Sequence, residues 1–392
     1  MGPVIKIKKV MIIAGEASGD LHGARVVEAM CQRAPDLFFF GIGGEALKAA
    51  GVKILVEAAT LSVVGITEVF AKLPNLLRGM RCAKRALQQL KPDLLILIDF
   101  PDFNLHVAAA AKKAKIPVLY YISPQIWAWR TGRVKKIGSL VDHVAVILPF
   151  EEKFYQEHHI PVTFVGHPLL DAPLLPLKPI ASVDKDRELT IGLLPGSRDR
   201  EVASLLPVML EAASLLESRG RRTRFVISHA STLEASFFQA IMDQQPDKIR
   251  MEIHAGPVDQ LFEKCDLIVA ASGTVTLEAA IAGVPMIIIY KVSPLSYRLG
   301  RMLIQVPYIG LVNLINDEPV VTELVQDEVS ATNIADAVDS LIADPASIQS
   351  MREKLYATRE KLGGPGASGR VADIALGLMN TESARTGSRF RA

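Results

Sequence analysis

Cysteine is scarce in this sequence, whose 392 residues include three: Cys31, Cys82 and Cys265. They stand far apart, without the CxxC or CxxH spacing of structural zinc sites and without the cysteine density of small secreted domains. The sequence therefore predicts neither a structural zinc site nor a disulfide framework, and it favours a reducing compartment such as the cytoplasm.

An excess of charge of one sign is also missing. The 44 basic and 42 acidic side chains leave a formal net charge of +2, so no chain-wide cationic field favours nucleic acid as a partner. Long apolar runs are missing too, because Asp99, Glu278 and glycines interrupt them before the roughly 18 residues that a membrane-spanning helix needs. The apolar run near the N-terminus is also too short for a signal peptide. We expect no nucleic-acid partner and no membrane-spanning segment.

Short runs rich in Val, Ile, Leu and Phe alternate with helical patterns, which is typical of buried parallel strands joined by crossover helices. One series predicts strands at residues 10–14, 38–42, 94–100, 118–122, 144–148 and 163–165. A second series predicts strands at residues 190–194, 224–228, 250–254, 267–270 and 285–290. Together with the chain length, the two series predict an α/β protein of two doubly wound domains.

A proline-rich stretch with little periodicity, residues 168–188, separates the two series and predicts a linker or hinge around Gly166-His167-Pro168. We therefore place an N-terminal domain at residues 1–168 and a C-terminal domain at residues 169–349. A helix at about 350–380, interrupted by Gly363-Gly364-Pro365-Gly366, is expected to join the N-terminal domain, and residues 381–392 are expected to be frayed.

A loop rich in Gly and Ser follows the first predicted strand and precedes a helix. Such a loop presents backbone N–H groups to an anion or a sugar oxygen, which makes Gly15, Glu16, Ser18 and Gly19 candidate ligand-binding residues. The spacing is not GxGxxG, and Glu16 would repel a pyrophosphate, so a dinucleotide site is disfavoured. A tight turn with Ser18 or Asp20 as helix N-cap explains the same residues, and the pattern leaves both interpretations open.

The second series contains two comparable turns. The strand at 190–194 leads into Gly196, Ser197 and Arg198, where the arginine would stand at the ligand-binding edge of an open α/β sheet. An exposed arginine paired with Asp199 or Glu201 is the alternative.

The strand at 267–270 leads into Ser272, Gly273 and Thr274 at the start of a helix, which is a second candidate phosphate-binding turn. Glu278 follows within that helix among apolar neighbours, where a carboxylate needs hydrogen-bond donors such as ribose hydroxyls. The alternative is a glutamate on the solvent face of the helix.

The run at 94–98 ends at Asp99, followed by Asp102. A carboxylate at the carboxyl end of a central strand, among aromatic and proline residues, can have a raised pKa and serve as a general base. Asp99 is favoured because it continues the strand, whereas Asp102 is expected to cap a helix beginning near Asn104.

Two further segments combine apolar and basic residues. Both tryptophans, Trp127 and Trp129, precede Arg130 and further basic residues, which suits a sugar ring, an acyl chain and a phosphate. A helix start packed on the core explains them equally. Residues 71–91 carry no acidic residue, and an apolar stripe runs among basic residues that include Arg78, Arg81, Lys84 and Arg85.

This basic segment suits the surface of an anionic membrane, because apolar insertion and charge attraction then act together. An ordinary surface helix with its stripe on the core is the alternative.

Seven motifs occur in the order that resembles the lipid-A-disaccharide synthase family: GEASGD at 15–20, IDFPDFN at 98–104, SPQIWAWR at 123–130, LPFE at 148–151, FVGHP at 164–168, LLPGSR at 193–198 and ASGTVTLE at 271–278. The resemblance implies a GT-B architecture of two facing Rossmann-like domains with the active site in the cleft between them. It also implies transfer of 2,3-diacylglucosamine from UDP to the 6-hydroxyl of 2,3-diacylglucosamine 1-phosphate, with inversion and release of UDP.

Matched residue by residue, the resemblance makes Asp99 the family's essential aspartate, Arg198 its PGSR arginine and Glu278 its nucleotide-side glutamate. It also makes Asn313 an asparagine implicated in activity, although Val312 stands where the family usually has proline. The resemblance implies an enzyme that acts at the inner face of the cytoplasmic membrane, because both substrates are lipids.

No divalent metal is expected, because the single DxD pattern, Asp184-Lys185-Asp186, lies in the proline-rich stretch. Two rival functions remain compatible with the sequence. One is another enzyme of the same architecture, such as a UDP-sugar 2-epimerase, and the other is a nucleotide-sugar-binding protein without catalysis. The sequence does not indicate an oligomeric state.

Overall fold

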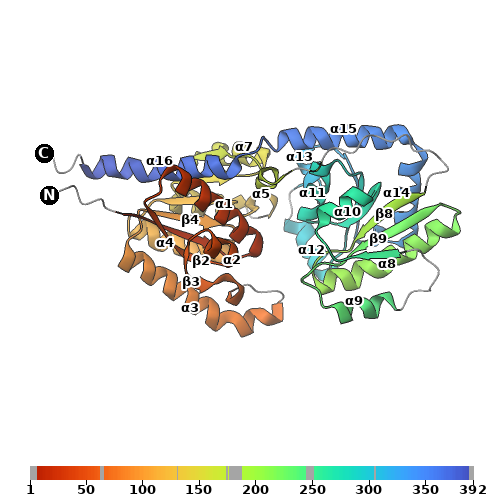
Figure 1. The fold of residues 1–392 in the computed structure, drawn as a ribbon, viewed down its shortest axis with the longest axis horizontal. Helices are drawn as coiled ribbons and strands as arrows, with labels where there is room; N and C mark the ends of the chain where they lie inside the picture. The colour runs from red at the N-terminus through yellow and green to blue at the C-terminus, as the bar shows by residue number, and fades with distance from the viewer. Residues whose placement is uncertain are drawn as a thin grey trace. The chain divides into compact units, whose positions relative to one another are not determined.

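The computed structural model describes residues 7–61, 66–129, 131–173, 175, 188–243, 251–303 and 306–387. The chain divides into two compact units, one formed by Met1–Ala172 with Leu362–Ala392 and the other by Pro173–Lys361 (Figure 1). Asp184 and Asp186 lie outside the described residues.

A parallel sheet forms the centre of the first unit, with the strand order β3-β2-β1-β4-β5-β6-β7. Its strands are β1 (Lys8–Ala14), β2 (Leu37–Gly43), β3 (Lys53–Glu57), β4 (Leu94–Ile98), β5 (Val118–Tyr121), β6 (His143–Val146) and β7 (Val162–Phe164). The direction of strand addition reverses between β1 and β4, which makes their carboxyl ends the topological switch point where such sheets bind ligands.

Helices cover both faces of this sheet (Figure 1). On one face α1 (Ala17–Arg33) and α16 (Ala367–Gly387) pack side by side over the even-numbered apolar residues of β1 and β4. On the other face lie α3 (Ile66–Leu90), α4 (Pro101–Lys113), α6 (Val134–Leu140) and α7 (Pro149–Glu157). The shorter elements are α2 (Glu45–Ala49), α5 (Ile126–Trp129), η1 (Ala58–Thr60), η2 (Thr131–Arg133) and η3 (Pro168–Asp171).

The second unit is built on a parallel sheet with the order β10-β9-β8-β11-β12-β13, the strand order of a Rossmann fold. The strands are β8 (Leu189–Leu194), β9 (Thr223–Ser228), β10 (Met251–His254), β11 (Leu267–Ala271), β12 (Met286–Tyr290) and β13 (Thr322–Val325). Its switch point lies between β8 and β11, so the turns after these two strands open at the same edge of the sheet.

The helices of the second unit also form two layers. One face carries α8 (Asp199–Ser218), α9 (Ala235–Met242) and α14 (Ala331–Ala343), and the other carries α10 (Val258–Lys264), α11 (Thr274–Ala282), α13 (Leu311–Asn316) and α15 (Pro345–Lys361). The remaining elements are α12 (Pro294–Leu303) and η4 (Gln326–Glu328).

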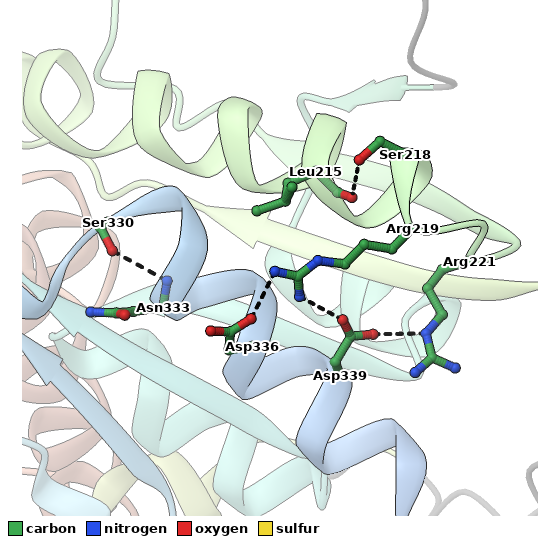
Figure 2. A network of polar contacts seen from close by, with 8 residues as sticks. All are labelled: Leu215, Ser218, Arg219, Arg221, Ser330, Asn333, Asp336 and Asp339. Carbon is green, nitrogen blue, oxygen red and sulfur yellow. Dashed lines mark hydrogen bonds and ion pairs between the residues drawn. The ribbon is translucent and has the colours of Figure 1, made fainter.

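A network of ion pairs joins the end of α8 to α14 at the protein surface (Figure 2). Arg219 contacts Asp336 at 2.8 Å and Asp339 at 2.7 Å, and Arg221 contacts Asp339 at 2.7 Å. Ser330 caps the same α14 by accepting a hydrogen bond from the N–H of Asn333. These contacts support the apolar packing of α8 against α14 rather than replace it, because exposed ion pairs are individually weak.

All the predicted strands are confirmed, but two strands were missed. Both β3 and β13 lie at sheet edges and are only partly buried, and their apolar runs, residues 54–56 and 324–325, are too short to separate a strand from a helix or loop. The prediction that the strand at 94–100 reaches residue 100 is wrong, because Asp99 and Phe100 adopt the left-handed conformation and end β4 at Ile98.

The C-terminal helical pattern forms two helices on either side of the predicted glycine-proline break. α15 packs against α11, α13 and α14 of the second unit, whereas α16 packs against α1 of the first. α16 continues to Gly387, so the first part of the segment expected to be frayed, from residue 381, is helical. No proline or glycine interrupts residues 378–386, which allows the helix to continue.

The predicted hinge at Gly166-His167-Pro168 lies inside the first unit rather than at its boundary. The N–H of His167 donates to the carbonyl of Leu362 at 2.9 Å, and Arg370 donates to the carbonyls of Val165, Gly364 and Pro365. These contacts fix residues 165–168 against the start of the α16 segment. Rotation at these residues would break them, so the prediction of a hinge at Gly166 is not supported by this packing.

Within the described part of the chain, no helix is long and apolar enough to cross a membrane.

Candidate active site

The predicted ligand-binding turns lie at the switch points of the two sheets. In the first unit, residues 15–20 follow β1 and Asp99 follows β4. In the second unit, residues 195–198 follow β8 and residues 272–274 follow β11. Each unit therefore presents one pair of neighbouring turns at the edge where open α/β sheets bind ligands.

Asp99 occupies a strained backbone position at the end of β4. Its φ angle is 45°, that of Phe100 is 49° and that of Ile122, at the end of β5, is 54°. Such values are rare for non-glycine residues and persist only where surrounding contacts enforce them. The side-chain amide of Asn104 donates to the Asp99 carbonyl at 2.6 Å, the Tyr120 hydroxyl donates to it at 2.9 Å, and the Asp99 N–H donates to the Ile122 carbonyl at 3.2 Å.

The environment of the Asp99 carboxyl group raises its pKa to about 6. Burial is the main cause, and the nearby Glu16 carboxylate adds to it, while a hydrogen bond from the N–H of Phe100 acts in the opposite direction. A carboxylate with a pKa close to neutral can accept a proton from a hydroxyl group more effectively than an ordinary aspartate.

The turn after β1 approaches Asp99 closely. A Cβ on Gly15 would lie 2.3 Å from the ring of Phe100, so only glycine allows this ring to pack on the turn. Gly19 is buried, whereas Glu16 and Ser18 are exposed at the start of α1. Glu16 is the N-cap residue of α1 and its side chain makes no capping hydrogen bond. The first turn of α1 thus keeps its N–H groups available for a ligand.

Two capping predictions for this region are wrong. Asp20 does not cap its own helix, because its buried carboxylate accepts hydrogen bonds from the N–H groups of Gly44 at 2.6 Å and Ala46 at 2.9 Å, at the start of α2. Asp102 does not cap a helix near Asn104, because α4 already begins at Pro101, a position that proline favours. Asp102 instead forms an ion pair with Arg133 at 3.0 Å.

The turn after β8 also depends on a glycine. Gly196 has a φ angle of 107°, and a Cβ there would lie 2.6 Å from a carboxylate oxygen of Glu201. Arg198 is exposed at the N-cap of α8 and pairs with Glu201 at 2.7 Å, as one of the two predictions for it stated. Ser197 is exposed, and its carbonyl accepts a hydrogen bond from the Thr232 hydroxyl. This exposed ion pair is weak enough for Arg198 to exchange Glu201 for a ligand phosphate.

The turn after β11 leads directly into α11. The Ser272 N–H donates to the carbonyl of Ile289 at 3.0 Å, and Gly273 and Thr274 are exposed at the helix start. Gly273 leaves space for a ligand, because a Cβ at this position would meet no other atom within 4 Å. The positive end of the α11 dipole and its first N–H groups therefore face an open surface.

Glu278 lies one turn further along α11 and is largely buried. Burial, and secondarily the charge of Asp259, raise its pKa. The described residues offer its carboxylate no hydrogen-bond donor. Because Glu278 is partly exposed, its carboxylate can accept hydrogen bonds from a ligand or from water.

Asn313 lies in the interior of the second unit. Its amide donates to the Val321 carbonyl at 2.9 Å and to Glu323 at 2.7 Å, and its side-chain oxygen accepts the N–H of Val321 at 2.9 Å. Glu323 in turn accepts the N–H groups of Ile309 and Gly310. Asn313 is 1% exposed. In this arrangement it orients the turn before α13 and does not offer its side chain to a ligand.

Trp127 is buried in the core of the first unit, so the prediction that its ring contacts an acceptor is not supported. The indole is 8% exposed, its N–H donates to Glu151 at 3.0 Å, and its ring packs edge-on against Phe150. The alternative, a helix start packed on the core, describes it better. Trp129 ends α5, but its side chain, like Arg130 as a whole, lies outside the described residues.

Residues 71–90 of the basic segment lie in α3. Arg78, Arg81 and Arg85 are exposed and Lys84 is partly exposed. The apolar stripe divides, because Leu87 enters the core whereas Leu73 and Leu77 are 46% and 52% exposed. A groove of about 490 Å³ runs between this helix and Leu55 of β3. The alternative that the whole stripe faces the core is therefore wrong for these two leucines.

The structure thus brings Gly15 and Glu16 together with Asp99, and it places the turns that contain Arg198 and Ser272 at one edge of a second sheet. Sequence reasoning missed Tyr120, Asn104 and Glu151 as supporting residues, although two of them lie in the quoted motifs IDFPDFN and LPFE. Among the described residues, no group of three or more His, Cys, Asp or Glu side chains could hold a metal ion.

Comparison with known protein families gives a match over almost the whole chain. The lipid-A-disaccharide synthetase family matches residues 10–374. The lipid-A-disaccharide synthase of Syntrophus aciditrophicus is 47% identical over 381 residues, which cover 95% of this chain and 98% of the relative. That of Geobacter metallireducens is 46% identical over 377 residues, which cover 95% and 97% respectively.

Solved structures with low sequence identity share the fold. CalG4, the calicheamicin glycosyltransferase, superimposes with a TM-score of 0.60 at 15% identity over 95% of this chain and 99% of its own. MurG of Acinetobacter baumannii gives 0.58 at 17% identity over 94% and 99%. A UDP-GlcNAc 2-epimerase from Neisseria meningitidis bound to UDP-GlcNAc gives 0.60 at 14% identity over 95% and 100%. The two α/β units are those of the GT-B fold.

Proposed function

Because the chain belongs to the lipid-A-disaccharide synthase family, we propose how its own residues carry out the synthase reaction. The protein is a glycosyltransferase of lipid A biosynthesis. In the proposed reaction, the 6-hydroxyl of 2,3-diacylglucosamine 1-phosphate attacks the anomeric carbon of UDP-2,3-diacylglucosamine. The bond from that carbon to the diphosphate breaks, its configuration inverts, and UDP leaves with the bonding electron pair.

Asp99 is the proposed general base that accepts the proton of the attacking hydroxyl group. The observation that carries this role is a partly buried carboxylate whose pKa is raised to about 6, held by a strained backbone at the switch point of the first sheet. Gly15, Glu16, Ser18 and Gly19, at the neighbouring turn, are placed to bind hydroxyl groups of the substrates through backbone N–H groups and the Glu16 carboxylate.

The second unit supplies the proposed UDP site. Arg198, Gly196 and Ser197 after β8, together with Ser272, Gly273 and Thr274 at the start of α11, would stabilise the negative charge that grows on the diphosphate. Glu278 would accept hydrogen bonds from the ribose hydroxyls, which supply the donors that the protein does not provide. Asn313 would act indirectly, by orienting the turn that precedes α13.

A peripheral position at the cytoplasmic face of the inner membrane is part of the same proposal. Substrates with two acyl chains reside in a bilayer, so the enzyme has to reach the interface. Exposed Leu73 and Leu77 beside Arg78, Arg81 and Arg85 on α3 combine apolar and basic groups, as interfacial helices do.

Three substitutions test these roles. Asp99→Asn should lower the rate by about 10² to 10⁴, the usual effect of removing a general base, while UDP affinity stays near that of the parent. Arg198→Ala and Glu278→Ala should instead raise the KM for the UDP-sugar and weaken UDP binding in calorimetry.

The outcomes separate the alternatives. Near-normal turnover of Asp99→Asn would make Asp102 the candidate base, and unchanged UDP affinity in both other variants would remove the nucleotide from the second unit. Release of UDP that depends on the acceptor distinguishes transfer from the 2-epimerase reaction, which needs no acceptor.

A further inference from the structure

Glu151 and Trp127 form a buried pair that the proposed chemistry does not use. One carboxylate oxygen of Glu151 accepts the Trp127 indole N–H at 3.0 Å, and the other accepts the N–H groups of Leu148 at 3.0 Å and Ile147 at 3.3 Å. Glu151 is 3% exposed. All three donors are neutral, so this carboxylate is buried without a cation among its hydrogen-bond partners, which is costly unless its geometry is required.

The pair connects the segments that follow two neighbouring strands of the first sheet, β5 and β6. Residues 147–148 follow β6, and Glu151 lies in the first turn of α7. Trp127 lies in α5, within the segment of residues 122–133 that follows β5. The edge-on contact between the rings of Trp127 and Phe150, with centroids 4.7 Å apart, adds to the connection.

The same segment reaches Asp99 at its beginning and α4 at its end. The Ile122 carbonyl accepts the Asp99 N–H at 3.2 Å, and the Ile122 N–H donates to the Ala145 carbonyl of β6 at 3.1 Å. Arg133 pairs at 3.0 Å with Asp102, in the first turn of the helix that follows Asp99. Polar contacts therefore hold the segment at residues 122, 127 and 133, and Ile126 beside Trp127 packs in the core. The polar contact at residue 127 depends on Glu151.

We propose that Glu151 is a positioning residue for glycosyl transfer, which acts through Trp127 and the segment of residues 122–133 to hold Asp99 in its reactive geometry. The inference rests on the proposed role of Asp99. Glu151 touches neither substrate in this scheme. Its carboxylate is needed because two acceptor oxygens must receive donors from two different elements, and a glutamine has a single acceptor oxygen.

Misplacement of a reacting group by about 1 Å can cost roughly 10²-fold in rate. Glu151→Gln should therefore lower kcat by about 10- to 100-fold and leave the KM for the UDP-sugar near that of the parent. Glu152→Gln is the matched control, because this neighbouring glutamate also accepts a backbone N–H, that of Phe164 at 2.9 Å, and among the described residues no hydrogen bond or ion pair joins it to the segment. It should retain the kcat of the parent.

A double-mutant cycle tests whether Glu151 acts through Trp127. Trp127→Phe keeps an aromatic ring and removes the indole N–H, so the effects of Glu151→Gln and Trp127→Phe on kcat should be less than additive. Additive effects would overturn the proposal. The fluorescence of Trp127, isolated by Trp129→Phe, should shift to longer wavelength and become more quenchable by acrylamide in Glu151→Gln but not in Glu152→Gln.

Thermal unfolding separates positioning from loss of the fold. If Glu151→Gln lowers Tm as much as Glu152→Gln does and both keep the same kcat, Glu151 is merely structural and the proposal is wrong. The parent and Asp99→Asn are assayed in parallel. A parent without acceptor-dependent UDP release would contradict the proposed function itself, whereas an active parent, an inactive Asp99→Asn and a fully active Glu151→Gln would contradict this inference alone.

Discussion

At the scale of single residues, backbone strain marks the candidate active site. Asp99, Phe100 and Ile122 all have positive φ angles at the carboxyl ends of two neighbouring strands. Each such residue costs of the order of 1–3 kcal/mol. The hydrogen bonds from Asn104 and Tyr120 to the Asp99 carbonyl stabilise this conformation. The left-handed conformation of Asp99 and Phe100 ends β4 at Ile98.

The first prediction concerns the pH dependence of the rate. A base with its pKa raised to about 6 is protonated and inactive at lower pH, so kcat/KM, which reports the pKa values of the free enzyme, should rise through a limb near pH 6. Because the Glu16 carboxylate contributes to the raised pKa, Glu16→Gln should move this limb to lower pH. Profiles of kcat/KM against pH measure the shift, with Glu45→Gln, on the exposed surface of α2, as the control. A limb that stays in place or moves to higher pH contradicts the proposed pairing.

The same carboxyl group predicts an effect on stability. The pKa of Asp99 is higher in the folded protein than its ordinary value of 3.8, so ionisation of Asp99 opposes folding as the pH rises through this range. Asp99→Asn should therefore unfold at a higher temperature than the parent above about pH 6, and the difference should vanish below about pH 4. Thermal unfolding followed by circular dichroism at both pH values tests it. Equal Tm values at neutral pH would show that the carboxylate is not destabilised by burial.

At the scale of elements, the N-terminus of α16 depends on a residue from a distant part of the chain. The Asp171 carboxylate accepts the N–H groups of Gly366, Ala367 and Ser368 at 2.7–2.9 Å, together with the Ser368 hydroxyl. Burial alone would raise the pKa of Asp171, but these hydrogen bonds outweigh it and lower the pKa. The cap thus joins η3 to the helix that covers α1.

Loss of this cap should destabilise the first unit. Asp171→Ala should lower the free energy of unfolding by about 0.5–2 kcal/mol, the usual value of an N-cap, and Asp171→Asn should lose less because it keeps one acceptor. Since the folded-state pKa is lowered, the contribution of Asp171 is present at neutral pH and disappears as the pH falls through that pKa. Denaturant unfolding at neutral and acidic pH measures both effects. A penalty for Asp171→Ala that persists unchanged in acid would contradict the assignment.

The exposed face of α3 predicts binding to anionic membranes. A variant with Arg78, Arg81, Lys84 and Arg85 replaced by serine should lose vesicle affinity, because each basic residue near an anionic surface contributes about 1 kcal/mol. The binding of the parent should fall steeply with added salt. Vesicle sedimentation at low and high salt measures both effects.

Two further variants test which groups of the surface are involved. Leu73→Ser with Leu77→Ser should remove the part of the binding that salt does not affect. Lys135→Ser with Lys136→Ser, on the exposed side of α6, tests whether the second basic segment, residues 127–136, contributes to the binding. Parent-like binding of the quadruple variant at low salt would exclude α3 as the contact and make residues 127–136 the next candidates.

At the scale of the whole molecule, the two units differ in continuity. The second unit is a single stretch, Pro173–Lys361, whereas the first needs both Met1–Ala172 and Leu362–Ala392. Without α16, the apolar face formed by α1 and the sheet would be open to water, because Val371, Ala372 and Ala375 cover it. Because Leu362–Ala392 follow the second unit in the chain, the first unit lacks part of its structure until the second unit has been synthesised.

This difference predicts the behaviour of fragments. Residues 173–361 alone should fold and bind UDP, and Arg198→Ala in the fragment should weaken that binding. Residues 1–172 alone should not fold cooperatively, because about 25 cal/mol of stabilisation is lost for each Å² of apolar surface left uncovered. Circular dichroism and calorimetry test both fragments. A second-unit fragment that folds but does not bind UDP would place the nucleotide elsewhere.

The sequence by itself indicated where most of the strands lie and where the candidate ligand-binding turns follow them. Fully buried strands such as β4 and β11 are continuous apolar runs, and turn residues follow each of them, Asp99 to Asp102 after β4 and Ser272 to Thr274 after β11, so local chain chemistry indicates both features. The edge strands β3 and β13 were missed because their apolar runs, residues 54–56 and 324–325, are too short for a local pattern to separate strand from helix or loop. Local pattern thus identified the turns after β4, β8 and β11, which contain Asp99, Arg198 and Ser272 respectively.

Only the tertiary structure decided what each of these side chains contacts. Asp20 caps α2 instead of its own helix, and Trp127 donates a hydrogen bond to Glu151 in the core. Asn313 donates a hydrogen bond to Val321, just before β13 begins. Each partner is separated along the sequence and comes within hydrogen-bond distance only when the sheets assemble. The pKa of Asp99 depends in the same way on burial and on Glu16, because electrostatic effects follow distance in space rather than position in the chain.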